Sequence, residues 1–306
     1  MHFLAVRSRK SHAFSTAVGQ VSARRAISIS EVEVNMHFLY CDESNLEHRA
    51  GDFLVYGGLI IPADRAASLT DTIRNMREDA GIAPDALVKF APHVPPLNHA
   101  RYRAFKQRMI EAAIEHHCLF IAYLVLHDLA GNPNAARRFG INTLCWHFHC
   151  IMIRMDDSGL VLIDRFNDDR NRADAQLREK MATGVALPHR DQPVQLNRII
   201  GFHNSAIGQA HFTSLVDILV GSLRFAINAY CRNEPANQRG ARNVLRLISP
   251  LFYRKRPRGP IPDLGLIFSP MNVRVQRYYD MYVGLQEFLR DRGVDSAQRI
   301  TNHARG

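Results

Sequence analysis

Short apolar runs alternate along this chain with longer segments in which apolar residues recur every three or four positions. A run of about four to eight apolar residues is typical of a buried strand, and the longer periodic segments are typical of helices with one buried face. We predict strands over residues 37–41, 52–61, 86–90, 118–126, 160–163, 195–202 and 264–268. We predict helices over residues 63–80, 98–117, 134–155, 173–183, 212–230 and 273–292.

The order of these elements predicts the fold class. Three strands come before the regular alternation of strands and helices begins, which favours an α/β fold with a mixed sheet flanked by helices. The sequence shows no internal repeat and no domain boundary after Met36. We therefore predict one domain over residues 36–306, with a C-terminal helical elaboration from about residue 234.

Residues 1–35 differ in composition from the rest of the chain. They contain five basic and only two acidic residues, so the remainder still has a formal net charge of +7. They lack the apolar core of a secretory signal, although an organelle transit peptide is similarly rich in Arg and Ser. The start Met1-His2-Phe3-Leu4 recurs at residues 36–39. We interpret residues 1–35 as a disordered basic extension that precedes the domain.

Composition limits the partners of the domain. The formal net charge is +10 and the isoelectric point about 9.7, which suits nucleic acid because Lys and Arg displace counterions from phosphates; many soluble proteins are equally basic without an anionic partner. No run of about 18 apolar residues predicts a membrane span. Five scattered cysteines without a CxxC pair indicate a reducing compartment, so we expect a cytoplasmic protein.

Three aspartates stand where a soluble protein should avoid a charge. Asp42 and Asp164 each end a predicted strand, and Asp217 lies within the apolar helix 212–230. A buried carboxylate is costly unless it is paired or binds a cation, and carboxylates brought together repel one another. Hard divalent cations accept such oxygen ligands. The three aspartates therefore predict one site for Mg²⁺ or Mn²⁺.

Each aspartate also has a structural interpretation. Aspartate often follows a strand in a turn, which would account for Asp42 and Asp164. Asp217 belongs to a polar stripe on its helix, where it faces solvent or pairs with Arg224 two turns later. Small residues beside it leave room for another element or a hydrated ion. The stripe consists of Ser214, Asp217, Gly221, Arg224 and Asn228.

Other polar clusters have weaker functional interpretations. The Cys and His residues of the helix segment 145–150 are candidate zinc ligands. No second ligand pair at zinc-finger spacing exists, and burial in a helical core explains these residues better. His203 and His211 are candidate proton shuttles or ordinary loop histidines. The basic loop 254–258 either binds a nucleic-acid backbone or is simply solvated. The zinc candidates are Cys145, His147, His149 and Cys150.

Several short motifs occur in a consistent order between Met36 and Asn228. They are Asp42-Glu43-Ser44 after an apolar strand, Tyr56-Gly57-Gly58-Leu59, Leu87-Val88-Lys89-Phe90, Leu160 to Asp164, and Ser214-Leu215-Val216-Asp217. In this order they resemble a large prokaryotic family, the domain of unknown function 3800 proteins. That family looks like a branch of the ribonuclease H-like superfamily, whose members cleave or transfer phosphodiesters with clustered carboxylates.

The resemblance implies specific roles. Asp42, Asp164 and Asp217 would be the metal ligands, with Asp42 as the bridging ligand. The family usually has Gln where this chain has Ser214, which affects hydrogen bonding on the substrate side. By analogy, the family also suggests a role in defence or with mobile elements.

Three further residues lie beside the predicted site. Glu43 is a candidate catalytic ligand, but it points to the opposite face if the strand stays regular. Lys89 contacts a phosphate or is a solvated strand-end lysine. Arg224 contacts a phosphate or pairs with Asp217.

The resulting prediction is a divalent-metal-dependent nuclease with a ribonuclease H-like fold. Two metal ions about 4 Å apart would activate a water and stabilise the departing oxygen. The main alternative is a catalytically inactive nucleic-acid- or protein-binding module with the same fold. A third possibility is hydrolysis or transfer on a smaller phosphorylated substrate. The three aspartates favour catalysis, and the basic charge favours a polymeric substrate.

Overall fold

The computed structural model describes residues 35–44, 46–47, 49–165, 172–187 and 191–303. The chain divides into two units, Met1–Glu33 and Val34–Gly306, and only the second is described. The predicted extension lies, except for residue 35, outside the described residues.

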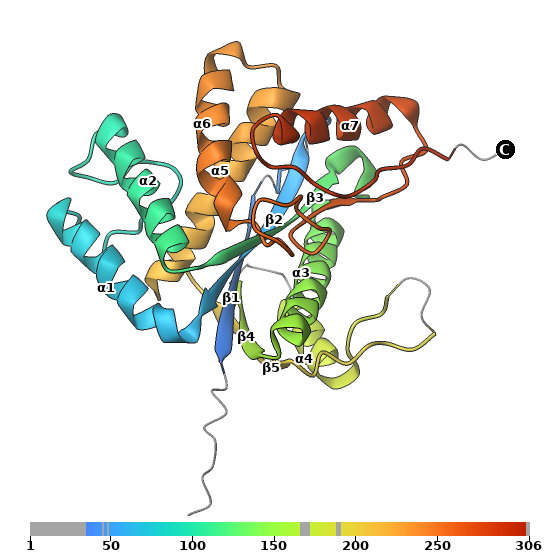
Figure 1. Ribbon diagram of the computed structural model, residues 1–306, viewed down its shortest axis with the longest axis horizontal. Helices are drawn as coiled ribbons and strands as arrows, with labels where there is room; N and C mark the ends of the chain where they lie inside the picture. The colour runs from blue at the N-terminus through green and yellow to red at the C-terminus, as the bar shows by residue number, and fades with distance from the viewer. Residues whose placement is uncertain (1–34, 45, 48, 166–171, 188–190, 304–306) are drawn as a thin grey trace, which may run out of the picture. The chain divides into compact units, whose positions relative to one another are not determined.

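A six-stranded mixed sheet forms the centre of the second unit (Figure 1). Its spatial order is β5-β4-β1-β2-β3-β6. β1, β2 and β3 pair antiparallel, whereas β4 joins β1, β5 joins β4 and β6 joins β3 in parallel. The strands are β1 (Met36–Ser44), β2 (Phe53–Pro62), β3 (Leu119–Leu126), β4 (Ser158–Asp164), β5 (Ile199–Ser205) and β6 (Leu266–Ser269). The predicted α/β class with a mixed sheet is confirmed.

Seven α-helices lie in the described part of the chain. They are α1 (Ala63–Asp79), α2 (His99–Glu115), α3 (Pro133–Met155), α4 (Arg172–Thr183), α5 (His211–Cys231), α6 (Gln238–Ile248) and α7 (Gln276–Arg290). Short 3-10 helices are η1 (His127–Leu129), η2 (Pro235–Asn237) and η3 (Ser249–Leu251). Helices α2 and α3 begin after Asn98 and Asn132, whose side chains accept hydrogen bonds from backbone N–H groups of the first turn.

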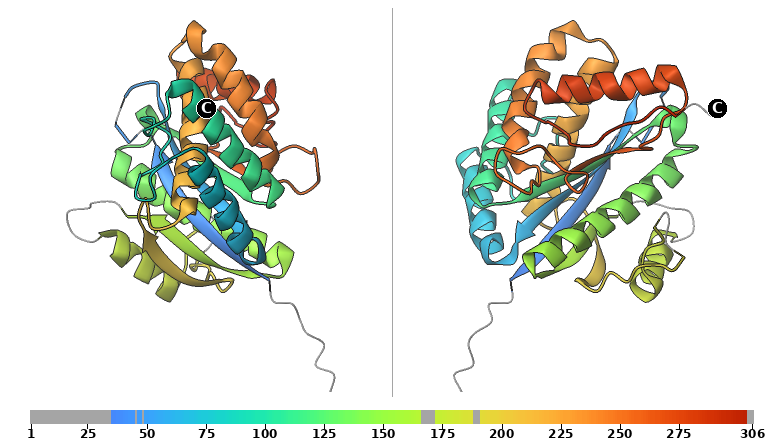
Figure 2. Two further views of the ribbon diagram at one scale, coloured as in Figure 1. Left: turned by 90° about the vertical axis from the view of Figure 1, so that its left-hand side faces the viewer. Right: turned by 45° about the vertical axis from the view of Figure 1, so that its right-hand side comes forward.

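Helices cover both faces of the sheet (Figures 1 and 2). α1, α2, α5 and α6 pack on one face, and α3 packs on the other. Two separate apolar clusters result, one on each face. Because β2 lies between both layers, nine of its ten residues are buried, and its sequence is a continuous apolar run.

Helix α5 is the central helix of its layer. It is the one described helix that is long and apolar enough to cross a membrane, yet 83% of that apolar window is buried inside the protein. Tight packing against the sheet requires a glycine, because a Cβ atom at Gly57 of β2 would collide with the Val220 side chain of α5. α5 is therefore a core helix held directly against the sheet.

Replacing Gly57 with alanine is expected to lower the free energy of unfolding by about 1–3 kcal/mol, because the added methyl overpacks a rigid contact. Urea unfolding monitored by circular dichroism measures this change. Gly240→Ala on the exposed side of α6 is the control, with a change below about 1 kcal/mol. Equal effects of the two substitutions would contradict the close α5–β2 contact.

One predicted strand is wrong, and two other elements differ from their prediction. Residues 86–90 do not form a strand; their backbone groups bond to side chains rather than to a neighbouring strand. Helix α6 lies in the predicted C-terminal helical elaboration but was not assigned individually, although Ala241, Leu245 and Ile248 bury one face of it. The strand predicted at 195–202 is displaced to β5.

Candidate active site

Asp42 and Asp164 lie beside each other at the edge of the sheet where β1 and β4 end. Cys41 is the register partner of Ile163. The next residues on these two strands, Asp42 and Asp164, are therefore neighbours as well. Side chains alternate between the two faces. Tyr40 and Leu162 pack in the cluster under α5, and the residues two positions later therefore also face α5. Parallel neighbouring strands thus bring two carboxylates together on one face.

Asp217 approaches the same face from α5. Helix α5 contacts β1 through Phe212, whose ring lies 5.4 Å from the ring of Tyr40. It contacts β2 at Gly57, the register partner of Asp42. Asp217 lies on the helix between these two contacts and is half-buried. The structure therefore brings all three predicted aspartates to one region.

The electrostatics of the three carboxyl groups are coupled. Burial raises the pKa of Asp42 well above its usual value, and the charges of Glu43, Asp217 and Asp164 raise it further. Burial also raises the pKa values of Asp164 and Asp217, and Asp217 adds to the shift of Asp164. Carboxyl groups in this state favour either a proton or a cation.

The three aspartates provide the carboxylate oxygens that a hard divalent cation prefers. In the structure, however, these oxygens do not converge on one position. Within the described ranges, no three His, Cys, Asp or Glu side chains are arranged to hold a metal ion. Each of the three carboxylates has a backbone hydrogen-bond partner instead, which for Asp164 is the backbone of Arg165. Asp217 Oδ2 accepts from the Phe90 N–H at 2.5 Å, and Asp42 Oδ1 accepts from the Glu43 N–H at 2.8 Å.

Glu43 lies on the other face of the sheet. Its Oε1 forms an ion pair at 3.3 Å with the Nη1 of Arg137 on α3, and both side chains are only 8% exposed. This is the orientation that a regular strand predicts for the residue after Asp42. Burial raises the pKa of Glu43, while Arg137 opposes the shift. We therefore exclude Glu43 from the candidate ligand set.

Residues 86–90 belong to the irregular segment between α1 and α2, and the Phe90 end of this stretch covers Asp217. The Tyr102 hydroxyl bonds to both the N–H and the carbonyl of Lys89, and the Lys106 ammonium donates to the Phe90 carbonyl at 2.7 Å. Lys106 also lies 4.1 Å from the centre of the Phe90 ring. Burial lowers the pKa of Lys106 to about 8, against the opposing effect of Asp217. Side chains of α2 thus hold this segment over α5.

Lys89 belongs to this segment and faces the acidic site. Its side chain is half-buried, and its charge lowers the pKa values of Asp164 and Asp217. Both acids, on different elements, therefore lie within electrostatic range of one ammonium group.

The polar stripe on α5 is covered in part by Phe90. A Cβ atom at Gly221 would collide with the Phe90 ring, so this ring fills the space beside the small residue. The Arg224 guanidinium lies 5.6 Å from the same ring, and its charge lowers the pKa of Asp217. Among the ion pairs of the described residues, none joins Arg224 to Asp217. Ser214 is buried within α5.

The other candidate residues lie outside this cluster or in the core. His203 is exposed on β5, and His211 is half-buried at the start of α5. Cys145, His147 and His149 are buried in α3, and burial lowers the pKa of His147 to about 4. Arg254 is structural, because its guanidinium donates to four backbone carbonyls.

Sequence reasoning missed Phe90, Tyr102 and Lys106 as parts of the site. Tyr102 and Lys106 are four residues apart and share a face of α2, which was the one available signal. Their partners lie 13 and 16 residues away along the chain, beyond any helical spacing.

No protein-family model matches this chain, and comparisons with curated proteins and with solved structures found no match. The functional argument therefore depends on the geometry of the site.

Proposed function

We propose that this chain is a divalent-metal-dependent phosphodiester hydrolase that acts on nucleic acid. The observation that carries the proposal is the pair of aspartates at adjacent ends of the parallel strands β1 and β4, with Asp217 above them on α5. Such buried, mutually repelling carboxylates are unfavourable unless a proton or a cation neutralises them. Mg²⁺ and Mn²⁺ prefer such oxygen ligands.

We also propose that the fold is ribonuclease H-like. The three consecutive antiparallel strands β1 to β3, with the parallel strands β4 and β5 added on the β1 side, support this assignment. The strand β6, which pairs parallel with β3 at the opposite edge, is an addition to that arrangement. The acidic positions at the ends of β1 and β4 support it as well. The same positions carry the resemblance to the domain of unknown function 3800 proteins, which stays a proposal.

Each residue has a defined part in the proposed reaction. Asp42 and Asp164 would hold a divalent cation, which would supply activation of a water and stabilisation of the departing oxygen. Asp217 completes the carboxylate set, with one oxygen kept in place by the Phe90 N–H. Lys89 places a positive charge beside the acids and contacts a substrate phosphate there. Ser214, which is buried, and Arg224, which is half-buried beside the Phe90 ring, support α5 instead of contacting substrate.

The charge of the chain supports a polymeric substrate, and its five free cysteines support a cytoplasmic location. The formal net charge of +10 attracts a polyanion along an extended surface. A small phosphorylated substrate would need only a local cation.

A cleavage assay tests this function. Full-length protein is incubated with end-labelled RNA, DNA and RNA–DNA hybrids in Mg²⁺ or Mn²⁺, or with EDTA. We expect metal-dependent cleavage of at least one substrate. Asp42→Asn and Asp164→Asn should lower the rate by about 100-fold or more, because bound cations supply several kcal/mol of transition-state stabilisation.

Asp280→Asn is the matched control, because Asp280 is an exposed aspartate on α7 that accepts a hydrogen bond from Gln276. It should cleave at the parental rate. Cleavage that persists in the Asp42 and Asp164 variants would contradict the proposal. A folded parent that binds nucleic acid but cuts none of the substrates would identify the inactive binding module instead.

A further inference from the structure

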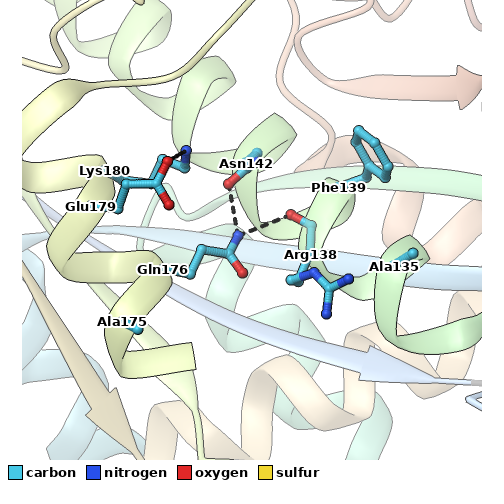
Figure 3. Close-up of a pocket in the computed structure, with 8 residues that line it drawn as sticks. All are labelled: Ala135, Arg138, Phe139, Asn142, Ala175, Gln176, Glu179 and Lys180. Atoms are coloured by element: carbon cyan, nitrogen blue, oxygen red, sulfur yellow. Dashed lines mark hydrogen bonds and ion pairs between the residues drawn. The ribbon is translucent and has the colours of Figure 1, made fainter. Parts of the chain in front are cut away.

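A groove of about 520 Å³ lies between α3 and α4 (Figure 3). It is separate from the three aspartates, which lie on the α5 side of the sheet. The groove combines an exposed aromatic ring, two side-chain amides, two cations and one carboxylate. Its lining consists of Ala135, Arg138, Phe139, Asn142, Ala175, Gln176, Glu179 and Lys180.

Gln176 is a buried polar group with unused bonding capacity. The residue is only 9% exposed. Its Nε2 donates to the Asn142 Oδ1 at 2.8 Å and to the Arg138 carbonyl at 3.2 Å. Its Oε1 has no hydrogen-bond donor among the residues that the structure describes. A buried acceptor without a donor is unfavourable. Because this oxygen is shielded from solvent, a ligand N–H group reaches it only when the Gln176 side chain turns toward the groove.

The cations of the groove outnumber its carboxylates. Lys180 is 9% exposed, and its ammonium pairs with Glu179 Oε1 at 3.1 Å. That carboxylate is largely exposed, so solvent screens its charge. Arg138 contributes a second positive charge on the α3 side. The lining therefore has a formal charge of +1 and attracts an anionic ligand.

Phe139 provides an apolar surface at the rim of the groove. The residue is 64% exposed, although a phenyl ring is normally buried in a soluble protein. An exposed aromatic ring beside cations is the arrangement on which the bases of single-stranded nucleic acids stack.

We propose that this groove holds one nucleotide of a single-stranded nucleic acid, which rests on the proposed function. The base stacks on Phe139 and donates a hydrogen bond to Gln176 Oε1. The adjoining phosphate lies near Lys180 and Arg138. A nucleotide supplies the aromatic face, the N–H donor and the anion together, whereas an acidic peptide offers backbone N–H groups and carboxylates without a base to stack on Phe139.

Two contacts connect the groove to the edge of the sheet where Asp42 and Asp164 lie. Arg137, next to Arg138 on α3, pairs with Glu43 at the end of β1. Asp174, next to Ala175 on α4, accepts a hydrogen bond at 2.6 Å from Asn204 of β5. The residue after Asn204 is the register partner of Asp164. The groove therefore lies near the edge of the sheet that carries the carboxylates, on the face opposite to α5.

Binding of labelled single strands tests this inference separately from cleavage. Full-length Asp42→Asn protein is titrated into fluorescein-labelled 12-nucleotide RNA or DNA in EDTA at one fixed salt concentration, and fluorescence anisotropy gives Kd. Adding Phe139→Ala should weaken binding about tenfold or more, because a stacked base contributes about 1–3 kcal/mol. Phe139→Tyr, which keeps the aromatic face, should stay within about twofold of the parent.

Ile153→Ala is the matched control, since Ile153 is an exposed apolar residue on the same helix. Its Kd should equal that of the parent, and nucleoside monophosphates should compete where inorganic phosphate does not. Equal Kd values for Phe139→Ala and Ile153→Ala would overturn the inference. Competition by an acidic peptide that is unaffected by Phe139→Ala would overturn it too.

The two proposals fail in distinguishable ways. Binding that depends on Phe139, in a protein whose parent cuts no substrate, supports the groove and contradicts the hydrolase. Cleavage that requires Asp42, with binding indifferent to Phe139, supports the hydrolase and overturns the groove.

Discussion

The Asp42→Asn protein is expected to unfold at a higher temperature than the parent in EDTA, and to gain no stability from Mg²⁺ or Mn²⁺. The Asp42 carboxylate is buried beside Asp164 and Asp217, so its charge destabilises the metal-free fold. An asparagine side chain has the same shape and still accepts the hydrogen bond of the Glu43 N–H. Removing such a functional charge commonly adds about 0.5–2 kcal/mol to stability, at the cost of metal binding.

The same residue predicts a pH dependence. Burial and neighbouring carboxylates raise the pKa of Asp42, so the folded chain keeps a proton that the unfolded chain releases. The stability of the metal-free parent therefore falls as the pH rises from the unfolded value through the folded pKa. Asp164 and Asp217 have raised pKa values too and act in the same direction. Asp42→Asn should make this slope smaller without abolishing it.

Thermal unfolding from pH 5 to 8, with EDTA or Mn²⁺, measures both effects. The parent should gain most from Mn²⁺ at the higher pH, where the carboxylates are free to bind it. Asp280→Asn should behave as the parent does. An Asp42→Asn protein that is less stable than the parent in EDTA would show that this carboxylate supports the fold, and the metal site would lose its main ligand.

Local patterns predicted most of the fold. Buried strands such as β2 and β3 are continuous apolar runs, and helices such as α2 and α3 begin at asparagine caps. These signals lie within the element itself. Residues 86–90 show where such signals fail, because an apolar run forms a strand only if a partner strand is available. Phe90 bonds instead to Asp217, 127 residues away, and no local pattern contains that information.

In the candidate site, too, local features were predictable from the sequence and contacts between distant segments were not. Strand ends and side-chain alternation were enough to place Asp42 and Asp164 on one face and Glu43 on the other, since both follow from strand geometry. The space beside Gly221 was recognised, but its occupant was not, because Phe90 reaches it through contacts with α2. The pairing of Glu43 with Arg137 spans 94 residues and was equally inaccessible.

Replacing Arg137 with methionine is expected to lower the free energy of unfolding by about 3–5 kcal/mol, because it leaves the buried Glu43 carboxylate without its cation. Both side chains are 8% exposed, so water does not replace the lost partner. Arg154→Met makes the same change at an exposed position of the same helix and should cost less than about 0.5 kcal/mol. Urea unfolding at constant pH measures both.

Glu43 also gives this variant a characteristic pH profile. Burial raises the pKa of Glu43, and Arg137 opposes that shift, so the pKa rises further once Arg137 is removed. The folded variant then keeps a proton that the unfolded chain releases, and its stability falls more steeply than that of the parent as the pH rises. Adding Glu43→Gln should remove this extra slope and recover part of the lost stability. Equal unfolding free energies for Arg137→Met and Arg154→Met would show that the ion pair does not hold Glu43, and this carboxylate would again be a candidate ligand beside Asp42.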